Sequence, residues 1–318
     1  MTYLDLSTGK ETLERPRTVL GLGNFDGVHL AHRELLESVV RLASRLEKSG
    51  KKENPETEIV PAVWCFERPS SDFLSKAPVG HLTTLEQRLE LFRDAGIRYA
   101  VLDRFEDVRD MSPEQFIHER LLNECRCQGV VCGFNFRFGK GGAGTPETLR
   151  LTFDPCLVKP RRVCMGGVVS SSRIRWLIRA GDLELADLLL GRPFELTGVV
   201  YEGHHLGREL GVPTVNQRFG PDSVIPRRGI YVTQAVVDGN VYPAVSNVGF
   251  RPTVDTGREL NCETHILGFD REVYGSRISV RFLKRLRDEI RFETTEALRT
   301  AIQEDIRDAE RYFSEHPV

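Results

Sequence analysis

The sequence lacks the long apolar segments that mark membrane proteins. No run approaches the roughly 18 consecutive apolar residues of a membrane-spanning helix, and the apolar share of 40% is ordinary for a globular chain. Residues 1–17 contain no apolar segment behind a basic start, so they do not read as a signal peptide. We therefore expect a cytoplasmic protein that does not bind membranes.

Cysteine patterns with an obvious chemical purpose are also missing. The 7 cysteines form no Cys-x-x-Cys pair and leave an odd count, so a disulfide framework is not indicated. Cys125, Cys127 and Cys132 lie close together, but their spacing is poor for a tetrahedral zinc site. Reduced structural thiols are the preferred interpretation.

The chain has little net charge. Its 44 Lys and Arg residues and 46 Asp and Glu residues give a formal net charge of −2. Such a balance provides no bulk attraction to nucleic acid or to anionic lipid. We expect no nucleic-acid partner, and any phosphate-bearing ligand must be held by a local site.

The first half of the chain alternates between strand and helix signals. With 318 residues, the chain is long enough for two domains of about 150 residues each. Apolar runs within 17–25, 58–66, 97–105 and 128–134 predict buried strands. Helical repeats separate them at 32–49, 82–96 and 112–125. This alternation predicts a parallel sheet with helices on both faces.

The second half is predicted to be antiparallel. Residues 170–194 read as two short helices divided at Gly181, and several segments rich in β-branched and aromatic residues follow. Asp238-Gly239 between two apolar runs predicts a hairpin. The chain closes with an amphipathic helix, on which Leu298, Ile302, Ile306, Ala309 and Phe313 share one face. We place the domains at 1–192 and 193–318.

Residues 21–32, GLGNFDGVHLAH, join the first strand to the first helix. Glycines at 21, 23 and 27 let the backbone approach a ligand, and a helix N-terminus favours anions. His29 and His32 are three residues apart at the helix start and can face one point. These features predict a phosphate site, although a tight turn with two capping or solvated histidines explains the spacing equally well.

Two further segments of the first half carry phosphate-binding residue types. SSSRIR at 170–175 begins a helix with hydroxyl groups, and Arg173 and Arg175 add donors that an ordinary serine cap does not need. GFNFRFGKGGAG at 133–144 is a basic glycine loop, which also suits a disordered lid.

The second half contains a different set of candidates. In GHHLGRELGVPTVN, residues 203–216, a proline precedes Thr214 and Asn216, whose oxygens are suitable ligands for magnesium. A generic turn is the alternative. Glu263 lies within a β pattern, and spacing alone favours an edge residue facing water over an acid aimed into a site.

Taken together and in order, these motifs resemble the bifunctional riboflavin kinase and FMN adenylyltransferase (FAD synthetase) family of bacteria. GNFDGVHLAH, LTTLEQRLELF, GFNFRFGKGGAG and SSSRIRWLI are similar to the adenylyltransferase half. GVVYEGHHLGRELGVPTVN, SNVGFRPTVD and ETHILGFDREVYG are similar to the kinase half, and the similarity runs from about Arg17 to Phe313. The resemblance implies a Rossmann-like α/β nucleotidyltransferase domain, followed by a small antiparallel β-barrel with a C-terminal helix.

For the barrel, the resemblance implies riboflavin kinase activity. The 5′-hydroxyl of riboflavin attacks the γ-phosphate of ATP to give FMN, with Glu263 as the base. Thr214 and Asn216 are expected at Mg²⁺. The remaining residues that the family pattern carries over are Gly203, Gly207 and Tyr274 for ATP, and Arg287 and Phe292 for the flavin.

For the first domain, it implies that the FMN phosphate attacks the α-phosphate of a second ATP, which yields FAD and pyrophosphate. His29 and His32 donate hydrogen bonds to the charge that grows on that phosphate, and magnesium shields the triphosphate. The other residues expected to bind ATP or its phosphates are Gly23, Asn24, Phe25, Asp26, Gly27, Asn135, Ser171, Arg173 and Arg175.

The chain departs from the family pattern mainly in this first domain. Ala31 stands where glycine separates the histidines, Arg68 and Ser70 alter the FEPHP-like segment, and Asn135 replaces an aspartate. These changes support an alternative, in which the chain is a riboflavin kinase whose N-terminal domain is weakly active or only binds nucleotide. A flavin-binding module without turnover is disfavoured, because Thr214, Asn216 and Glu263 are all present.

Overall fold

The computed structural model describes residues 2–13, 15–54, 56–202, 211–251 and 259–317. It divides into two compact units, Met1–Ser171 and Ser172–Val318, which are described separately below. The division between residues 192 and 193 stays a prediction. In the described residues, no helix combines the length and apolar character needed to cross a bilayer.

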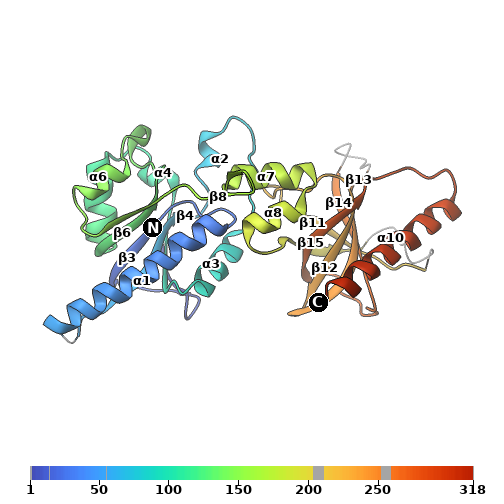
Figure 1. Ribbon diagram of the computed structural model, residues 1–318, viewed down its shortest axis with the longest axis horizontal. Coiled ribbons are helices and arrows are strands. Elements are labelled where there is room, and N and C mark those ends of the chain that lie inside the picture. Colours follow the sequence, from blue (N-terminus) through green and yellow to red (C-terminus); the bar gives the residue numbers. More distant parts are fainter. Residues whose placement is uncertain (1, 14, 55, 203–210, 252–258, 318) are drawn as a thin grey trace. The chain divides into compact units, whose positions relative to one another are not determined.

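A seven-stranded sheet forms the centre of the first unit, in the order β2-β1-β5-β4-β3-β6-β7 (Figure 1). Strands β3 to β7 are parallel, and β1 is antiparallel to both β2 and β5. The bounds are β1 Thr2–Asp5, β2 Lys10–Glu11, β3 Arg17–Leu22, β4 Ile59–Phe66, β5 Tyr99–Asp103, β6 Cys127–Gly133 and β7 Cys156–Lys159.

Helices cover both faces of this sheet, as the alternating sequence pattern predicts. Helices α1 (Leu30–Glu53) and α3 (Leu85–Asp94) contribute to the apolar cluster on one face. The π-helical segment η1 (Phe116–Glu124) and α6 (Pro146–Arg150) contribute to the cluster on the other. The remaining short elements are α2 Ser71–Leu74, α4 Phe105–Val108, α5 Pro113–Gln115, η2 Lys140–Gly142, β8 Val163–Cys164 and β9 Gly167–Val168.

The strand order reverses at β3, which lies between β4 and β6. In open parallel sheets, ligands bind outside the carboxyl ends of the strands at such a reversal. Residues 23–29 leave the carboxyl end of β3 and lead directly into α1. The fold therefore puts the glycine- and histidine-containing turn at the expected ligand-binding edge.

The second unit contains a closed antiparallel barrel with the strand order β10-β11-β14-β13-β12-β15 (Figure 1). The predicted hairpin is confirmed: Asp238 and Gly239, with φ of 51° and 79°, connect β12 to β13. Positive φ at both residues matches the type I′ turn that Asp-Gly favours. The bounds are β10 Phe194–Tyr201, β11 Val215–Phe219, β12 Gly229–Val237, β13 Asn240–Arg251, β14 Glu259–Ile266 and β15 Arg277–Arg287.

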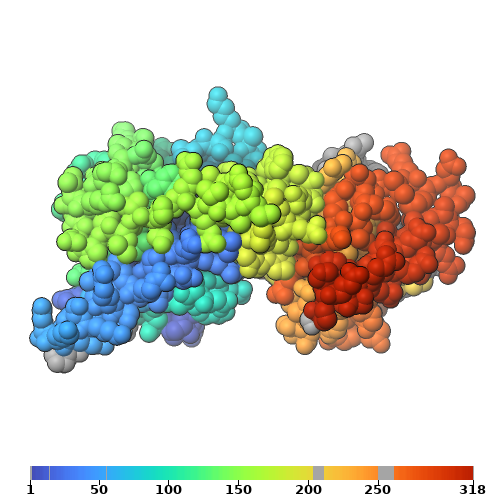
Figure 2. Space-filling view, in the orientation of Figure 1, coloured from blue at the N-terminus to red at the C-terminus, as the bar shows by residue number. Residues whose placement is uncertain are grey.

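In the described part of this unit, three helices accompany the barrel: α7 (Ser171–Ala180), α8 (Leu183–Leu190) and α10 (Thr295–Glu315). The predicted apolar face of the last helix is confirmed, because Ile306, Ala309 and Phe313 join an apolar cluster with strand residues of the barrel. The opposite side of α10 is exposed, and the helix lies along the outside of its unit (Figure 2).

Asp187 is a titratable group in the contact between α8 and the barrel. Its Oδ1 accepts a hydrogen bond of 2.8 Å from the backbone N–H of Phe194, at the start of β10. Burial raises the pKa of Asp187 to about 8 from its ordinary 3.8. Because the folded state holds the proton more tightly, this group's contribution to stability is fully present below about pH 4 and is lost as the pH rises towards 8.

We expect Asp187→Asn to remove this pH dependence, because the amide keeps an acceptor for Phe194 and carries no charge. Urea unfolding followed by circular dichroism should find the variant within about 0.5 kcal/mol of the parent near pH 3.5, and more stable than the parent by at least about 1 kcal/mol at pH 8, with the difference growing between these two values. Asp238→Asn, at an exposed carboxylate, is the control. Parallel stability profiles for Asp187→Asn and the parent would contradict the assignment.

Candidate active sites

The turn after β3 is fixed by a buried carboxylate. Asp26 accepts hydrogen bonds from the backbone N–H groups of Leu82 and Thr83, at 3.0 and 3.2 Å. The Thr83 hydroxyl in turn accepts from the N–H of Gly27 at 3.0 Å. Phe25, Gly27 and Val28 have positive φ, which is uncommon for the two residues with side chains. The bonds around Asp26 hold the turn in this strained shape.

Arg88 reinforces the same edge from helix α3. Its side chain is 1% exposed, and its guanidinium donates to the carbonyl oxygens of Asn24, Phe66 and Glu67. One cation thereby ties the carboxyl end of β3 to that of β4. The sequence reasoning missed this residue, although an arginine on the apolar face of a predicted helix, between Leu85 and Phe92, is a signal that could have found it.

His29 and His32 are brought together as predicted. Their rings stack with centroids 3.7 Å apart and planes at 9°. The Nδ1 atom of His29 accepts the backbone N–H of His32 at 3.4 Å and caps α1. A ring that accepts at Nδ1 carries its proton on Nε2, so His29 caps the helix as a neutral ring. The capping alternative is therefore confirmed, and a role towards a ligand stays a prediction.

His32 is held in its neutral form. Burial, and then the proximity of His29, lower the pKa of His32 well below its usual value. Its Nδ1 atom is buried and has no hydrogen-bond partner within the described part of the chain. The ring of Phe25 lies against it, with centroids 5.2 Å apart. His32 is therefore uncharged at neutral pH, and a hydrogen bond from it to an anion would carry no formal positive charge.

The other predicted residues of the first domain have different surroundings. Asn24 donates from Nδ2 to the Ser70 hydroxyl at 3.0 Å, and the Ser171 hydroxyl donates to the Asp26 carbonyl oxygen at 2.8 Å. Asn135 is exposed in the loop after β6. Arg173 and Arg175 belong to the second unit, so their role at the phosphates stays a prediction. Gly23 follows β3 directly.

In the barrel, Glu263 lies within a hydrogen-bonded set of side chains. It is opposite Asn216 in the register of β11 and β14, and the Nδ2 of Asn261 donates to both, at 3.0 Å to Glu263 Oε1 and 3.3 Å to Asn216 Oδ1. Strand β14 has β11 on one side and β13 on the other. The expectation of an edge residue facing water, drawn from spacing alone, is therefore wrong, because the barrel is closed.

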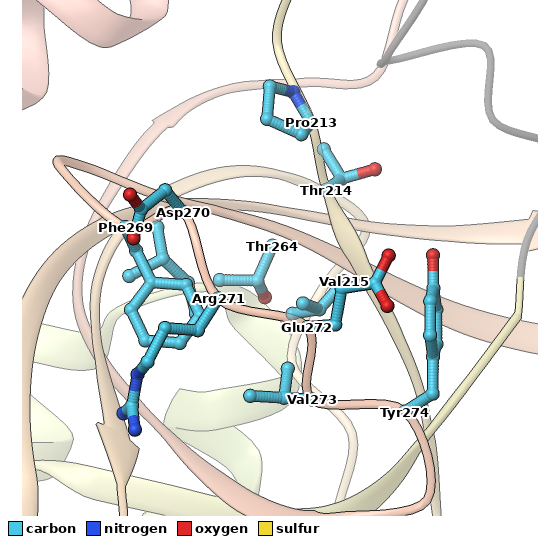
Figure 3. A pocket seen from close by; sticks show the side chains of 11 residues that line it. Pro213, Thr214, Val215, Thr264, Phe269, Asp270, Arg271, Glu272, Val273 and Tyr274 are labelled. Carbon is cyan, nitrogen blue, oxygen red and sulfur yellow. The ribbon is translucent and has the colours of Figure 1, made fainter.

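A pocket of about 320 Å³ adjoins these two strands (Figure 3). In this view the hydroxyl of Tyr274 and the carboxylate of Glu272 point towards the end where Thr214 lies. Thr214 and Tyr274, predicted for magnesium and ATP, thus share one cavity. The predicted Gly203 and Gly207 lie outside the described residues. The full lining is Pro213, Thr214, Val215, Thr264, Ile266, Phe269, Asp270, Arg271, Glu272, Val273 and Tyr274.

The donor set fits magnesium. Thr214 and Asn216 supply hydroxyl and amide oxygens two residues apart, and hard cations prefer oxygen ligands. Among the described residues there is no group of three or more His, Cys, Asp or Glu side chains suited to a metal. Magnesium commonly uses few protein ligands and completes its shell with water and substrate phosphates, so this arrangement is sufficient.

Arg287 and Phe292, predicted to border the flavin, are also brought together. The Arg287 guanidinium carbon lies 5.9 Å from the centroid of the Phe292 ring. Arg287 forms two hydrogen bonds to Asp305 of α10, of 2.8 and 2.6 Å. Burial raises the pKa of Asp305, while the guanidinium opposes that rise. The sequence reasoning missed Asp305. The surrounding helical sequence, DIRDAE, is mostly charged and is typical of an exposed helix face, so it does not indicate an ion pair with a strand.

Two family models match the chain, one for each unit. A model described as FAD synthetase matches residues 11–172, and one described as riboflavin kinase matches residues 190–313. A crystal structure titled as a macrolide-efflux protein from Streptococcus pneumoniae has a similar fold, with a TM-score of 0.80, 26% identity and coverage of 93% of this chain and 95% of that one.

Curated relatives agree over almost the whole length. The bifunctional riboflavin kinase/FMN adenylyltransferase of Bacillus subtilis is 33% identical, with 95% of this chain and 94% of the relative covered. The protein of the same name from Escherichia coli K12 is 32% identical, with 93% and 92% covered. The chain therefore belongs to the bifunctional riboflavin kinase/FMN adenylyltransferase family.

Proposed function

We propose that this protein phosphorylates riboflavin to FMN in the barrel and then adenylylates FMN to FAD in the first unit. ATP is the co-substrate of both reactions. The observation that carries the proposal is the set formed by Glu263, Asn261 and Asn216, in which one buried amide joins the predicted base to a predicted magnesium ligand. The stacked pair of His29 and His32 at the sheet edge supports the second reaction.

In the kinase step, Glu263 accepts the proton of the riboflavin 5′-hydroxyl as that oxygen attacks the γ-phosphorus of ATP. The bond from this phosphorus to the β,γ-bridging oxygen breaks, and ADP leaves. Thr214 and Asn216 would hold Mg²⁺, which neutralises charge on the triphosphate. Positioning and charge neutralisation supply most of the rate in phosphoryl transfer. Arg287 and Phe292 border the isoalloxazine ring in this proposal.

In the adenylyltransferase step, a phosphate oxygen of FMN attacks the α-phosphorus of a second ATP, and pyrophosphate leaves. The N–H groups of His29 and His32 donate to the oxygens on which charge accumulates, and the fixed turn around Asp26 keeps them in place. Ser171, Arg173 and Arg175 hold the outer phosphates. The reaction needs no covalent enzyme intermediate.

The same proposal specifies the ligands of the protein and its location in the cell. The protein takes riboflavin, FMN and ATP as substrates, releases FAD, and uses magnesium. The near-neutral charge balance, with a formal net charge of −2, gives no basis for a nucleic-acid partner. We propose a cytoplasmic location, where riboflavin and ATP meet.

The sequence of reactions predicts a characteristic time course. Purified protein incubated with riboflavin, excess ATP and magnesium should first form FMN and then FAD, resolved by chromatography. FMN that accumulates without conversion would favour the alternative, a riboflavin kinase with an inactive first unit. Absence of any product would contradict both.

Glu263→Gln should lower FMN formation at least about 100-fold, because the amide cannot accept the hydroxyl proton. FMN supplied directly should still be converted to FAD at the parental rate. The matched control is Glu195→Gln, which removes another barrel carboxylate, paired with Arg281 at 2.8 Å. Loss of both activities in Glu263→Gln would argue against separate sites.

His29→Ala should have the opposite effect. Removing one donor to the α-phosphate should lower FAD formation from FMN about 100-fold and leave riboflavin phosphorylation intact. His118→Ala, at an exposed histidine of the same unit, serves as the control. An unchanged rate of FAD formation in His29→Ala would refute the role proposed for this ring.

A further inference from the structure

Asn261 is a buried amide that joins the predicted base to the predicted magnesium ligand. Its side chain is 4% exposed, and its Nδ2 contacts Glu263 Oε1 at 3.0 Å and Asn216 Oδ1 at 3.3 Å. We infer that Asn261 is a positioning residue of the kinase site, which holds Glu263 and Asn216 in a fixed relation. This inference rests on the proposed kinase function.

The orientation of this amide is determined by its third partner. The Tyr201 hydroxyl donates to Asn261 Oδ1 at 2.5 Å. With the oxygen occupied by this donor, both N–H groups of the amide face Glu263 and Asn216, which accept them. Arg218 lies over the Tyr201 ring, 4.5 Å from its centroid, and steadies the ring. The opposite amide orientation would place oxygen against two acceptors.

Strand geometry explains why one side chain reaches both groups. Asn261 and Glu263 are two residues apart on β14 and share a face, and Asn216 is directly opposite Glu263 on β11. Asn261 is thus the diagonal neighbour of Asn216. Because all the contacting groups sit on hydrogen-bonded strands, the amide works as a rigid spacer between a proton acceptor and a metal ligand.

A role in positioning differs from a purely structural one in its kinetic effect. Asn261→Leu keeps the approximate volume and deletes all three hydrogen bonds. We expect kcat for FMN formation to fall about 10- to 100-fold, KM for riboflavin to change less than about threefold, and FMN-to-FAD conversion to be unchanged.

The control is Thr233→Val, which removes a buried bond of the same barrel, the 2.8 Å contact with the Ser246 hydroxyl. Thr233→Val should be less stable than the parent, but its kcat for FMN formation should not fall selectively. An Asn261→Leu variant with parental kcat, or with a kcat loss equal to that of Thr233→Val, would overturn the inference.

Tyr201→Phe supplies a second, milder test, because it removes only the hydroxyl that orients the amide. We expect kcat to fall about three- to tenfold. Since Tyr201 acts through Asn261, the double variant should be no slower than Asn261→Leu alone. Effects that multiply would show that the two residues act independently and would contradict the spacer role. If Asn261→Leu fails to fold, the single variant Tyr201→Phe still tests the inference, and a parental kcat in that variant would overturn it.

Binding provides a readout that needs no turnover. At a fixed concentration of ADP, titration calorimetry should find that Asn261→Leu needs about five- to tenfold more Mg²⁺ to reach half of the maximal ADP affinity, because Asn216 is no longer held. Riboflavin binding, followed by flavin fluorescence, should stay within threefold of the parent. An unchanged Mg²⁺ requirement would overturn the inference. If the parent itself makes no FMN, the proposed function fails rather than the role of Asn261.

Discussion

Two buried polar side chains, Asp26 and Arg88, hold together the edge of the first unit's sheet at which β3 and β4 end. Asp26 accepts hydrogen bonds from backbone N–H groups of the segment before α3, and Arg88 donates to backbone carbonyl oxygens at the ends of β3 and β4. Backbone groups satisfy the hydrogen-bonding capacity of both side chains. In return, Asp26 and Arg88 give partners to backbone N–H and C=O groups that would otherwise be buried without a hydrogen bond. The positive φ of Phe25 and Val28, and hence the direction in which α1 starts, depend on these bonds.

In the barrel, a neutral amide takes the place that Asp26 and Arg88 have in the first unit. Its candidate site combines a carboxylate, Glu263, with the oxygen of Asn216, and two acceptors side by side need a donor between them. Asn261 is that donor. In both units, buried polar side chains hold the candidate site residues through hydrogen bonds within the protein. Such residues are invisible to a search for chemically reactive types, because an asparagine in a strand and an arginine in a helix have many ordinary explanations.

The sequence predicted the parts of the fold that have a strong local signal. The Asp238-Gly239 hairpin, the apolar face of α10 and the alternation of strands and helices all follow from periodicity or turn chemistry. Strands β1 and β2 were not predicted, because four and two residues are too few to establish a period. Spacing also misjudged Glu263, since a strand's neighbours depend on barrel closure. The proximity of His29 and His32 was predictable, but their ring stacking was not.

The departures from the family pattern in the first unit leave its supporting framework intact. Ser70, which ends the FEPHP-like segment without its histidine, accepts a hydrogen bond from Asn24, and Ala31 is the second residue of α1, where alanine favours the helix. Neither residue contacts Asp26 or Arg88 through any hydrogen bond described above. The hydrogen bonds through which Asp26 and Arg88 hold the turn before α1 therefore do not depend on either substitution. In the proposed adenylyltransferase step, a neutral His32 supplies a hydrogen bond rather than charge, so that proposal assigns neutralisation of the triphosphate to magnesium and arginine. Changes at the rim should therefore affect nucleotide affinity more than the geometry of attack.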